Sequence, residues 1–513
     1  MGRRFPFFFI LAASLSAQTL HTVTANLTVL ARSAARKPPP STAPRPARTE
    51  GKPHRAAPAF IPGHGGTQTG NGAATLAGFG ALLDEYASNP PDCGGAVGPS
   101  DVVTMLNTQV LIQSRAGDPR PAFPMPLSQF WSPLGAFTKV FDPRVLYDAT
   151  AGRWLASAAA NPTSAESALL IAVSRTSDPA GDWTMSLIPV GSSGVWADYP
   201  QLGFNATWVV VTANLLELPP NGRYSASAVY AFDRAALYAG TPSFTTFQQD
   251  EGALVPATDL DDSYPGTLYF ARASTSGETG EVLVAALRGS KAAPEFQSAA
   301  ASIPLGEGWA DAAPAGDDFA PQRGTYFKID AGDSRLQNCV VRNAALWCAQ
   351  TVFLPAAKPN RSAVQWFQLD PAAASLQQSG RIDDAQAAEF YAFPSIAVNR
   401  FNDVVVGFAR FSGGAYPSAG FAHRLATDSS GTMRPVQTLK AGEAAYVAPG
   451  ADEGANRWGD FTVTVVDPAG DLGFWTIQQY AAVPTNHYLG RWGTWWSRIT
   501  LEPSAPAAAP TVR

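Results

Sequence analysis

Short runs of β-branched and aromatic residues alternate with turn residues from about residue 95 to residue 500. Gly, Pro, Asn and Asp separate these runs, which is typical of β-strands joined by tight turns. Helical periodicity is confined to short pieces such as 232–238. The pattern predicts an all-β fold and counts against a parallel sheet with alternating helices. The strand-like runs include 102–106, 168–173, 208–212, 282–285, 404–408 and 461–466.

A weak internal repeat runs through the same region. Each unit is a strand, a turn that contains Asp or Asn, and a second strand, as at 142–157, 198–214, 393–408 and 459–476. A unit of about 40 to 50 residues is the size of one β-propeller blade, and blades bury their faces by stacking in a ring. We predict a single β-propeller over residues 76–502. Seven blades are favoured, six or eight stay open, and a β-sandwich pair is the structural alternative.

The N-terminal region has a different composition. Arg3 and Arg4 precede an apolar run and small residues, which predicts a secretory signal peptide over residues 1–17. Residues 18–75 are rich in Pro, Ala and Arg and predict a disordered spacer, and 503–513 predict a flexible tail. No later stretch has the roughly 18 apolar residues of a transmembrane helix. We therefore expect a bacterial export product that is secreted or held in the cell envelope.

Charge and histidine content narrow the function classes. The first 75 residues hold nine of the 36 basic residues but one of the 41 acidic residues, so the remaining body is acidic. An acidic body disfavours nucleic-acid binding. Three of the five histidines, His21, His54 and His64, fall in the N-terminal region. This placement argues against histidine-based zinc chemistry or a Ser-His-Asp triad. The oligomeric state is not encoded in these patterns, and we assume a monomer.

Two of the three cysteines fall in one predicted hairpin. Cys339 and Cys348 lie on two strand-like runs that turn at Arg342 and Asn343, so they face each other across the turn. In an oxidising compartment such a pair forms a disulfide. Cys93 is then left unpaired, and three scattered cysteines do not suggest a metal site.

Segments between residues 94 and 500 resemble a broad family of secreted bacterial β-propeller proteins that has no established activity. This resemblance implies the fold but brings no catalytic residues. The chain departs from the family's Trp-Gly-Asp-Tyr by having Phe461 in place of Tyr. The segment 176–183 also resembles an Asp-box turn of sialidase-type propellers, which is a structural turn. The matching segments include 94–99, 145–148, 153–154, 172–174, 198–200, 232–234, 321–325, 416–418, 424–428, 431–433, 457–460 and 466–468.

Repeated acidic residues precede the predicted inner strands. In a propeller the loop that enters an inner strand lies at the mouth of the central channel, so these residues are expected to line one central face. Carboxylates bind hydroxyl groups and aromatic rings stack on sugar faces, which suits a carbohydrate ligand. Alternatively, a repeated Asp accepts backbone N–H bonds and is structural. The ligand-binding candidates are Asp142, Arg144, Asp198, Tyr199, Asp262, Tyr264, Arg457, Trp458 and Asp460.

A second acidic group is a weak calcium candidate, and no cofactor is otherwise indicated. Asp259, Asp261 and Asp262 offer oxygen ligands but lack the Gly and the distal Glu of an EF-hand loop. A solvated acidic turn is the alternative. Glu389 and Tyr391 are a formal sialidase-like pair of the kind that chance also produces.

Three functions compete. The favoured hypothesis is a secreted binding protein that holds a polysaccharide or a protein on one central face. The alternative is a carbohydrate-active hydrolase or lyase in the same fold, which a deep cavity with paired acids of raised pKa would support. The third hypothesis is a structural envelope protein that is tethered by the basic spacer.

Overall fold

The computed structural model describes residues 20–36, 64–70, 74–249, 252–276, 279–314, 318–448, 454–485 and 490–501. Strands dominate these residues, and nearly all strand pairs are antiparallel, so the predicted all-β class is confirmed. No helix in these ranges has the length and apolar character needed to cross a bilayer. The helical elements are α1 (Leu27–Arg36), α2 (Leu127–Trp131), η1 (Ser132–Leu134), η2 (Gly191–Ser193) and α3 (Arg234–Ala239).

The strands form groups in which each strand pairs with the next one along the chain. The first group is β4 (Gly94–Val97), β5 (Asp101–Met105), β6 (Gln109–Ser114) and β7 (Met125–Pro126). The second is β8 (Val140–Asp148), β9 (Arg153–Ala160), β10 (Ala168–Ser174) and β11 (Asp182–Pro189). Such meanders follow from the alternation of strand and turn residues in the sequence.

Three further groups are joined into one 12-stranded sheet by the parallel pairs β12–β16 and β16–β20. The first is β12 (Val195–Phe204), β13 (Trp208–Glu217), β14 (Tyr224–Asp233) and β15 (Phe244–Gln249). The next is β16 (Val255–Asp259), β17 (Leu268–Ser276), β18 (Thr279–Ser290) and β19 (Ala293–Pro304). The third is β20 (Leu336–Arg342), β21 (Ala345–Leu354), β22 (Arg361–Asp370) and β23 (Ser375–Ile382).

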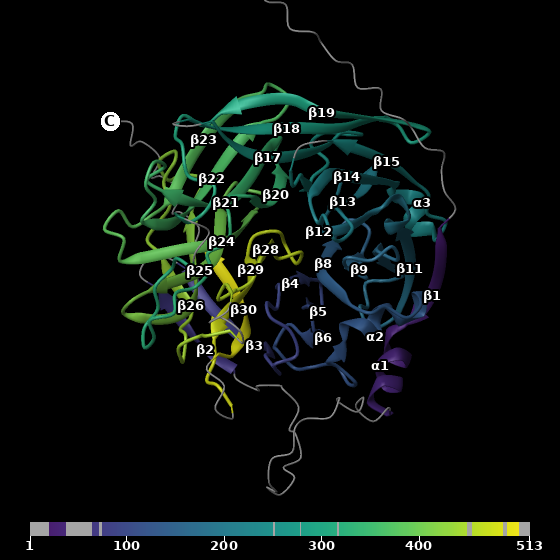
Figure 1. The fold of residues 1–513 in the computed structure, drawn as a ribbon, viewed down its shortest axis with the longest axis horizontal. Helices are drawn as coiled ribbons and strands as arrows, with labels where there is room; N and C mark the ends of the chain where they lie inside the picture. Colours follow the sequence, from purple (N-terminus) through teal and green to yellow (C-terminus); the bar gives the residue numbers. More distant parts are fainter. Residues whose placement is uncertain are drawn as a thin grey trace, which may run out of the picture.

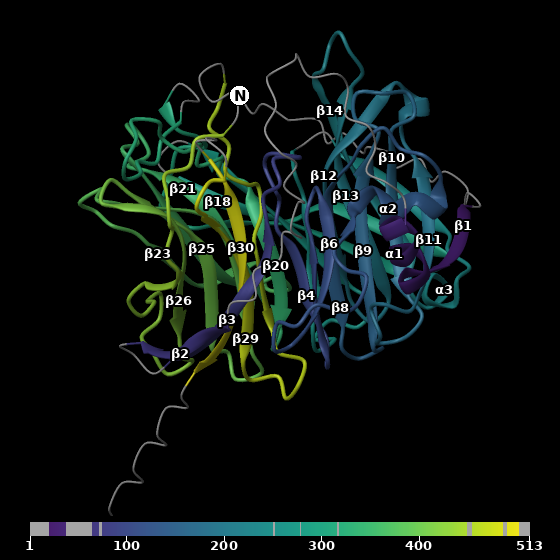
Figure 2. The same cartoon turned by 90° about the horizontal axis from the view of Figure 1, so that it is seen from below.

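The last two groups lie in the C-terminal third. One is β24 (Glu389–Val398), β25 (Val404–Ser412), β26 (Ala415–Arg424) and β27 (Gln437–Lys440). The other is β28 (Val463–Val466), β29 (Phe474–Ala481) and β30 (Trp492–Leu501). It is completed by two strands from the start of the chain, β3 (Ala74–Leu83) and β2 (His64–Gly70), and β3 lies beside β30 (Figure 2).

The centre of the molecule is bordered by β4, β8, β12, β20, β24 and β28 (Figure 1), and β16, the first strand of the remaining group, pairs with both β12 and β20. We call β4, β8, β12, β16, β20, β24 and β28 the inner strands. Each inner strand contacts the next one in this order, and β28 contacts β4. Because these strands run in the same order as the chain, residues from distant segments meet at their shared ends.

The sheet that contains β9 is buried on both faces at this strand. On β9, Trp154, Ala156 and Ala158 belong to one apolar cluster, whereas Leu155 and Ala159 belong to another. Successive side chains of a strand point to opposite faces, so each face of this sheet packs against a different neighbour. Two-sided burial explains why its strand residues are apolar almost without interruption.

Part of the predicted spacer is ordered, so the prediction for residues 18–75 is wrong where the structure describes them as strand or helix. The segment β1 (His21–Asn26) pairs with β11. Asn26 caps α1 by accepting a hydrogen bond from the Val29 N–H at 3.1 Å. Leu27 and Ala31, four residues apart, bury the inner face of α1. The predicted signal peptide, residues 37–63 and the predicted tail lie outside the described residues.

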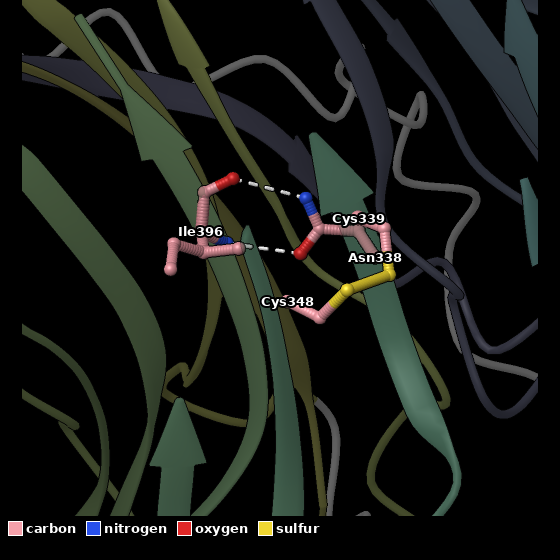
Figure 3. The surroundings of a disulfide bond; sticks show 4 residues. All are labelled: Asn338, Cys339, Cys348 and Ile396. Atoms are coloured by element: carbon pink, nitrogen blue, oxygen red, sulfur yellow. Dashed lines mark hydrogen bonds between the residues drawn. A yellow bond between two sulfur atoms is a disulfide. The ribbon is translucent and has the colours of Figure 1, made fainter. Parts of the chain in front are cut away.

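The predicted disulfide is confirmed. Cys339 and Cys348 are register partners on β20 and β21 and are bonded to each other. The neighbouring Asn338 bridges β20 to β24 (Figure 3), because its amide donates to the Ile396 carbonyl at 3.0 Å and accepts from the Ile396 N–H at 2.9 Å. Cys93 is unpaired and buried, and burial raises the pKa of its thiol.

Candidate functional site

A cavity of about 570 Å³ lies where the inner strands begin, and we call it the acidic cavity. Its lining comes from segments that are far apart in the chain. It combines six carboxylates with two guanidinium groups and several aromatic rings. The charged lining residues other than Lys139 are Asp92, Asp142, Asp198, Asp330, Asp333, Asp460, Arg335 and Arg457.

Three inner strands carry the same backbone irregularity at this cavity. The register of β8, β12 and β24 shifts near Asp142, Tyr199 and Phe393. These residues have φ values of 52°, 51° and 53°, and a proline follows each of them. Positive φ is disfavoured for residues other than Gly, and a bulge re-aims the side chain that it carries. All three side chains accordingly line the acidic cavity.

Asp92 is the most fully buried acid of the acidic cavity. It is 2% exposed and accepts hydrogen bonds from the Asp460 N–H at 2.8 Å and the Asn107 amide at 2.7 Å. Burial raises the pKa of Asp92 to about 7, and the nearby charge of Asp460 acts in the same direction. This carboxyl group therefore holds a proton up to neutral pH.

The other unpaired acids are also biased toward the protonated form. Burial raises the pKa of Asp142 well above its usual range, and the charges of Asp92, Asp198 and Asp460 add to this effect. Burial also raises the pKa of Asp198 and of Asp330. Carboxylates that crowd one buried site disfavour each other's ionisation, so the acids of this cavity bind protons more tightly than isolated aspartates.

Two acids of the acidic cavity are paired with arginines. The Arg457 guanidinium lies 2.5 Å and 2.6 Å from the two carboxylate oxygens of Asp460. Arg335 contacts Asp333 through Nε at 2.7 Å, and its guanidinium lies 4.5 Å from the centre of the Tyr199 ring. The acidic cavity thus places ion-paired carboxylates beside carboxyl groups whose pKa is raised, which is the arrangement of an acid–base pair.

Five of the predicted ligand-binding residues meet in the acidic cavity. They are Asp142, Asp198, Tyr199, Arg457 and Asp460. Two others lie close by but outside its lining. Trp458 is buried edge-on against Phe411 and Tyr446, and Arg144 lines a second cavity.

Asp262 and Tyr264 do not join the others, so the predicted common face is wrong for this pair. The inner strand of their group is β16, which ends at Asp259, so both residues follow an inner strand instead of preceding one. They lie at the opposite end, where Asp262 is exposed and the Tyr264 hydroxyl donates to the Ala344 carbonyl at 2.7 Å.

The calcium prediction gains no support from the geometry of its three carboxylates. Asp259 accepts a hydrogen bond from the Asp261 N–H at 3.2 Å, and Asp261 accepts from the Asn343 N–H at 2.7 Å. Within the ranges given above, no group of three or more His, Cys, Asp or Glu side chains is arranged to hold a metal ion. Asp259 and Asp261 hold a turn through these hydrogen bonds, and calcium binding stays a prediction.

Two other sequence motifs lie outside the acidic cavity. In the segment 176–183, Asp178 accepts from the Ala180 N–H at 3.1 Å and the Trp183 indole donates to the Pro179 carbonyl at 2.9 Å. This segment is a turn between β10 and β11. Glu389 pairs with Arg410 at 2.7 Å, so it is not free to act with Tyr391.

Sequence reasoning missed Asp92, Asp330, Asp333 and Arg335. Asp92 directly precedes β4, and the other three lie just before β20. Both segments precede inner strands, so the rule that a loop entering an inner strand lines the mouth of the central channel applies to each of them. It could have found these residues if 94–97 and 336–342 had been identified as inner strands.

No family model matches the chain, and no curated protein matches its sequence. Similar solved structures include a protein of unknown function from Dyadobacter fermentans, with 10% identity, a TM-score of 0.38, and coverage of 70% of this chain and 94% of that one. The NanB sialidase from Streptococcus pneumoniae has 7% identity, a TM-score of 0.38 and coverage of 79% and 80%. An α-L-arabinanase from Penicillium chrysogenum has 10% identity, a TM-score of 0.32 and coverage of 58% and 92%. Likenesses this low assign no function to the chain.

Proposed function

We propose that this chain is a seven-bladed β-propeller whose acidic cavity hydrolyses a glycosidic bond. The fold proposal is supported by the seven strand groups found among the described residues and by the successive contacts of their inner strands, with β28 against β4. Pairing of β3 with β30 joins the N-terminal and C-terminal parts of the chain within one blade.

The observation that carries the functional proposal is the convergence of acids in different electrostatic settings. Glycoside hydrolysis needs one carboxyl group to protonate the leaving oxygen and one carboxylate to act on the opposite side. Asp92, with a pKa raised to about 7 mainly by burial, is the proton donor. Asp460, paired with Arg457, is the second carboxylate. It either attacks the anomeric carbon or takes the proton from the attacking water.

The remaining lining suits a sugar. Phe141, Trp196, Tyr199 and Phe393 contribute aromatic rings to the acidic cavity, and sugar faces stack on such rings. The carboxyl group of Asp142, which has no ion-pair partner among the described residues, offers hydrogen bonds to hydroxyl groups. A volume of about 570 Å³ lies within the range of small-molecule sites. A polysaccharide end or a short oligosaccharide is the proposed substrate.

The test is turnover of a glycan panel by the purified chain, followed by Asp92→Asn and Asp460→Asn. We expect each substitution to lower turnover by about 10²-fold to 10⁴-fold, because it removes a proton-transfer group. Turnover by the unaltered chain should fall as the pH rises through about 7, since Asp92 then loses its proton. Asp262→Asn, at the opposite end of the inner strands, is the matched control and should leave turnover unchanged.

The panel also separates the competing hypotheses. Glycan binding without turnover would support the binding protein predicted from the sequence and contradict hydrolysis. Neither binding nor turnover of any glycan would contradict both. Export is part of the proposal as well, supported by the disulfide, which persists in oxidising compartments. N-terminal sequencing of the mature protein would test removal of residues 1–17.

A further inference from the structure

A second cavity, of about 270 Å³, lies further along the inner strands, and we call it the inner cavity. Its side walls are aliphatic and come from several inner strands, so it favours an apolar molecule. At about 30 Å³ per water-sized group, it has room for about nine non-hydrogen groups. Six of its wall residues are Val97, Val145, Leu202, Val340, Ala397 and Val465.

One unpaired cation lines this apolar space. Arg144, on β8, is 9% exposed and donates from Nε to the Pro200 carbonyl at 3.1 Å. Its guanidinium carbon lies 3.4 Å from the centre of the Phe461 ring and 5.8 Å from that of Tyr199. It makes no ion pair with any described residue, and its Nη2 has no hydrogen-bond partner there. Burial lowers the pKa of Arg144, but a guanidinium stays protonated.

Two glutamines add polar groups to the same cavity. Gln201 on β12 and Gln337 on β20 are 4% and 5% exposed. Within the described chain, the Nε2 of Gln201 and the Oε1 of Gln337 lack hydrogen-bond partners. Gln337 lines both cavities and therefore lies at their boundary. An unpaired buried polar group destabilises a fold, so the two unpaired donors, Arg144 Nη2 and Gln201 Nε2, indicate an absent hydrogen-bond acceptor. The Gln337 Oε1 is itself an acceptor and adds nothing to the argument for an anion.

The other charged groups that line the inner cavity are already paired. Arg342 pairs with Asp471, and Asp467 pairs with Arg115. Arg144 is therefore the lining cation, among the residues described, that lacks a carboxylate. A guanidinium matches a carboxylate in charge and in planar geometry. A phosphate dianion would not be neutralised by one guanidinium, whereas a monocarboxylate would.

We propose that the inner cavity binds an apolar monocarboxylate, with its carboxylate at Arg144 and the Gln201 amide and its hydrocarbon body along the aliphatic walls. This inference is independent of glycan hydrolysis, since it uses a different cavity and a different ligand class. Hexanoate, with eight non-hydrogen atoms, suits the available space.

Calorimetric titration of the full chain with sodium hexanoate at pH 7 tests this proposal. Hexanamide is the matched probe, because it has the same shape without the charge. We expect hexanoate to bind with one-to-one stoichiometry and hexanamide to bind at least tenfold more weakly. Equal binding of the two probes, or no binding of hexanoate, would overturn the proposal.

Substitutions in the inner cavity test whether the carboxylate of hexanoate lies at Arg144 and Gln201. Arg144→Gln should weaken hexanoate binding at least tenfold. Arg361→Gln removes an arginine that pairs with Asp383 at 2.7 Å and lines neither cavity, so it should leave hexanoate binding unchanged. If Arg144→Gln does not fold, Gln201→Met keeps the volume and removes one donor, and it should weaken binding of hexanoate but not of hexanamide. Unchanged hexanoate binding in a folded Arg144→Gln or Gln201→Met variant would contradict the assigned position.

Discussion

Both ends of the inner strands are rich in aspartate, but Asp148 at one end and Asp142 at the other have opposite surroundings. At the end where the strands finish, Asp148 is 1% exposed and accepts from Arg234 Nε at 2.9 Å, from the Tyr238 hydroxyl at 2.8 Å and from two backbone N–H groups. At the end where they begin, the carboxyl group of Asp142 faces three other acids and lies on a left-handed residue.

The same contrast extends to neighbouring groups. Asn205 donates to the Thr267 carbonyl at 2.9 Å, and Asn399 donates to the Leu472 carbonyl at 3.1 Å, so each ties its turn to the next strand group. Asp467 pairs with Arg115 and thereby ties the last group to the first. Satisfied polar groups stabilise a fold, whereas crowded buried acids destabilise it. The comparison of Asp148 and Asp467 with Asp142 teaches that the surroundings of an aspartate, more than its residue type, decide whether it stabilises the fold.

The largest expected effect is at the finishing end. Asp148→Ala should lower the free energy of unfolding by about 3 kcal/mol, because it leaves the largely buried Arg234 without its carboxylate. Urea unfolding followed by circular dichroism measures this loss. The exposed Asp262 is the control, and Asp262→Asn should change stability by less than about 0.5 kcal/mol. A small loss of unfolding free energy for Asp148→Ala would contradict the proposal that Asp148, unlike Asp142, stabilises the fold.

The stability contributions of Asp92 and Asp467, which lie at opposite ends of the inner strands, should also respond oppositely to pH. The pKa of Asp92 is raised to about 7, so its contribution to stability falls as the pH rises from about 4 to 7, by about 1 kcal/mol per pH unit. Burial alone would raise the pKa of Asp467, but hydrogen bonds led by that from Arg115 hold it below its usual value. The stability from Asp467 is therefore present above its usual pKa and is lost as the pH falls through the lowered value.

Unfolding free energies measured from pH 3 to pH 8 check these signs. Asp92→Asn should flatten the decline between about pH 4 and 7 and leave the acid limb in place. Asp467→Asn should flatten the acid limb and leave the decline between about pH 4 and 7 in place. The same slope in both variants would show that the two acids do not differ in kind.

The smallest expected effect is a gain. Asp142→Asn should raise the free energy of unfolding by about 1 kcal/mol at pH 8, since it removes a buried carboxyl that its neighbours repel. Asn also tolerates the left-handed backbone at this position. The gain should shrink as the pH falls, because the raised pKa of Asp142 favours its neutral form, and the same substitution should lower glycan turnover. A loss of stability at pH 8 would mean that Asp142 is a structural residue.

Local patterns predicted the parts of this molecule that depend on neighbours in the chain. The strand runs, the hairpin disulfide and the turn at 176–183 all depend on short spacings. The convergence of Asp142, Asp198 and Asp460 followed from the rule that residues at the entry to inner strands line one central face. The rule failed at Asp262, because β16 is short and lies just before the segment that was taken for the strand entry.

The remaining errors concern contacts made across long distances. Residues 21–36 are ordered by long-range contacts, since β1 pairs with β11 and α1 contacts α2. Composition contains no information about such contacts, so it predicted a disordered spacer. Asp330, Asp333 and Arg335 reach the acidic cavity from the connection before β20, which carries no repeat signal. The inner cavity depends on which buried polar atoms lack partners, and only coordinates contain that information.

The pairing of β3 with β30 has a consequence for how the chain is made. The Leu82 N–H donates to the Thr494 hydroxyl across a separation of 412 residues. During synthesis β3 therefore leaves the ribosome long before its partner β30. Contacts between such distant segments form slowly and late. Removal of β30 would therefore leave β3 with an open edge, and loss of the final dozen described residues should promote aggregation instead of a shorter native protein.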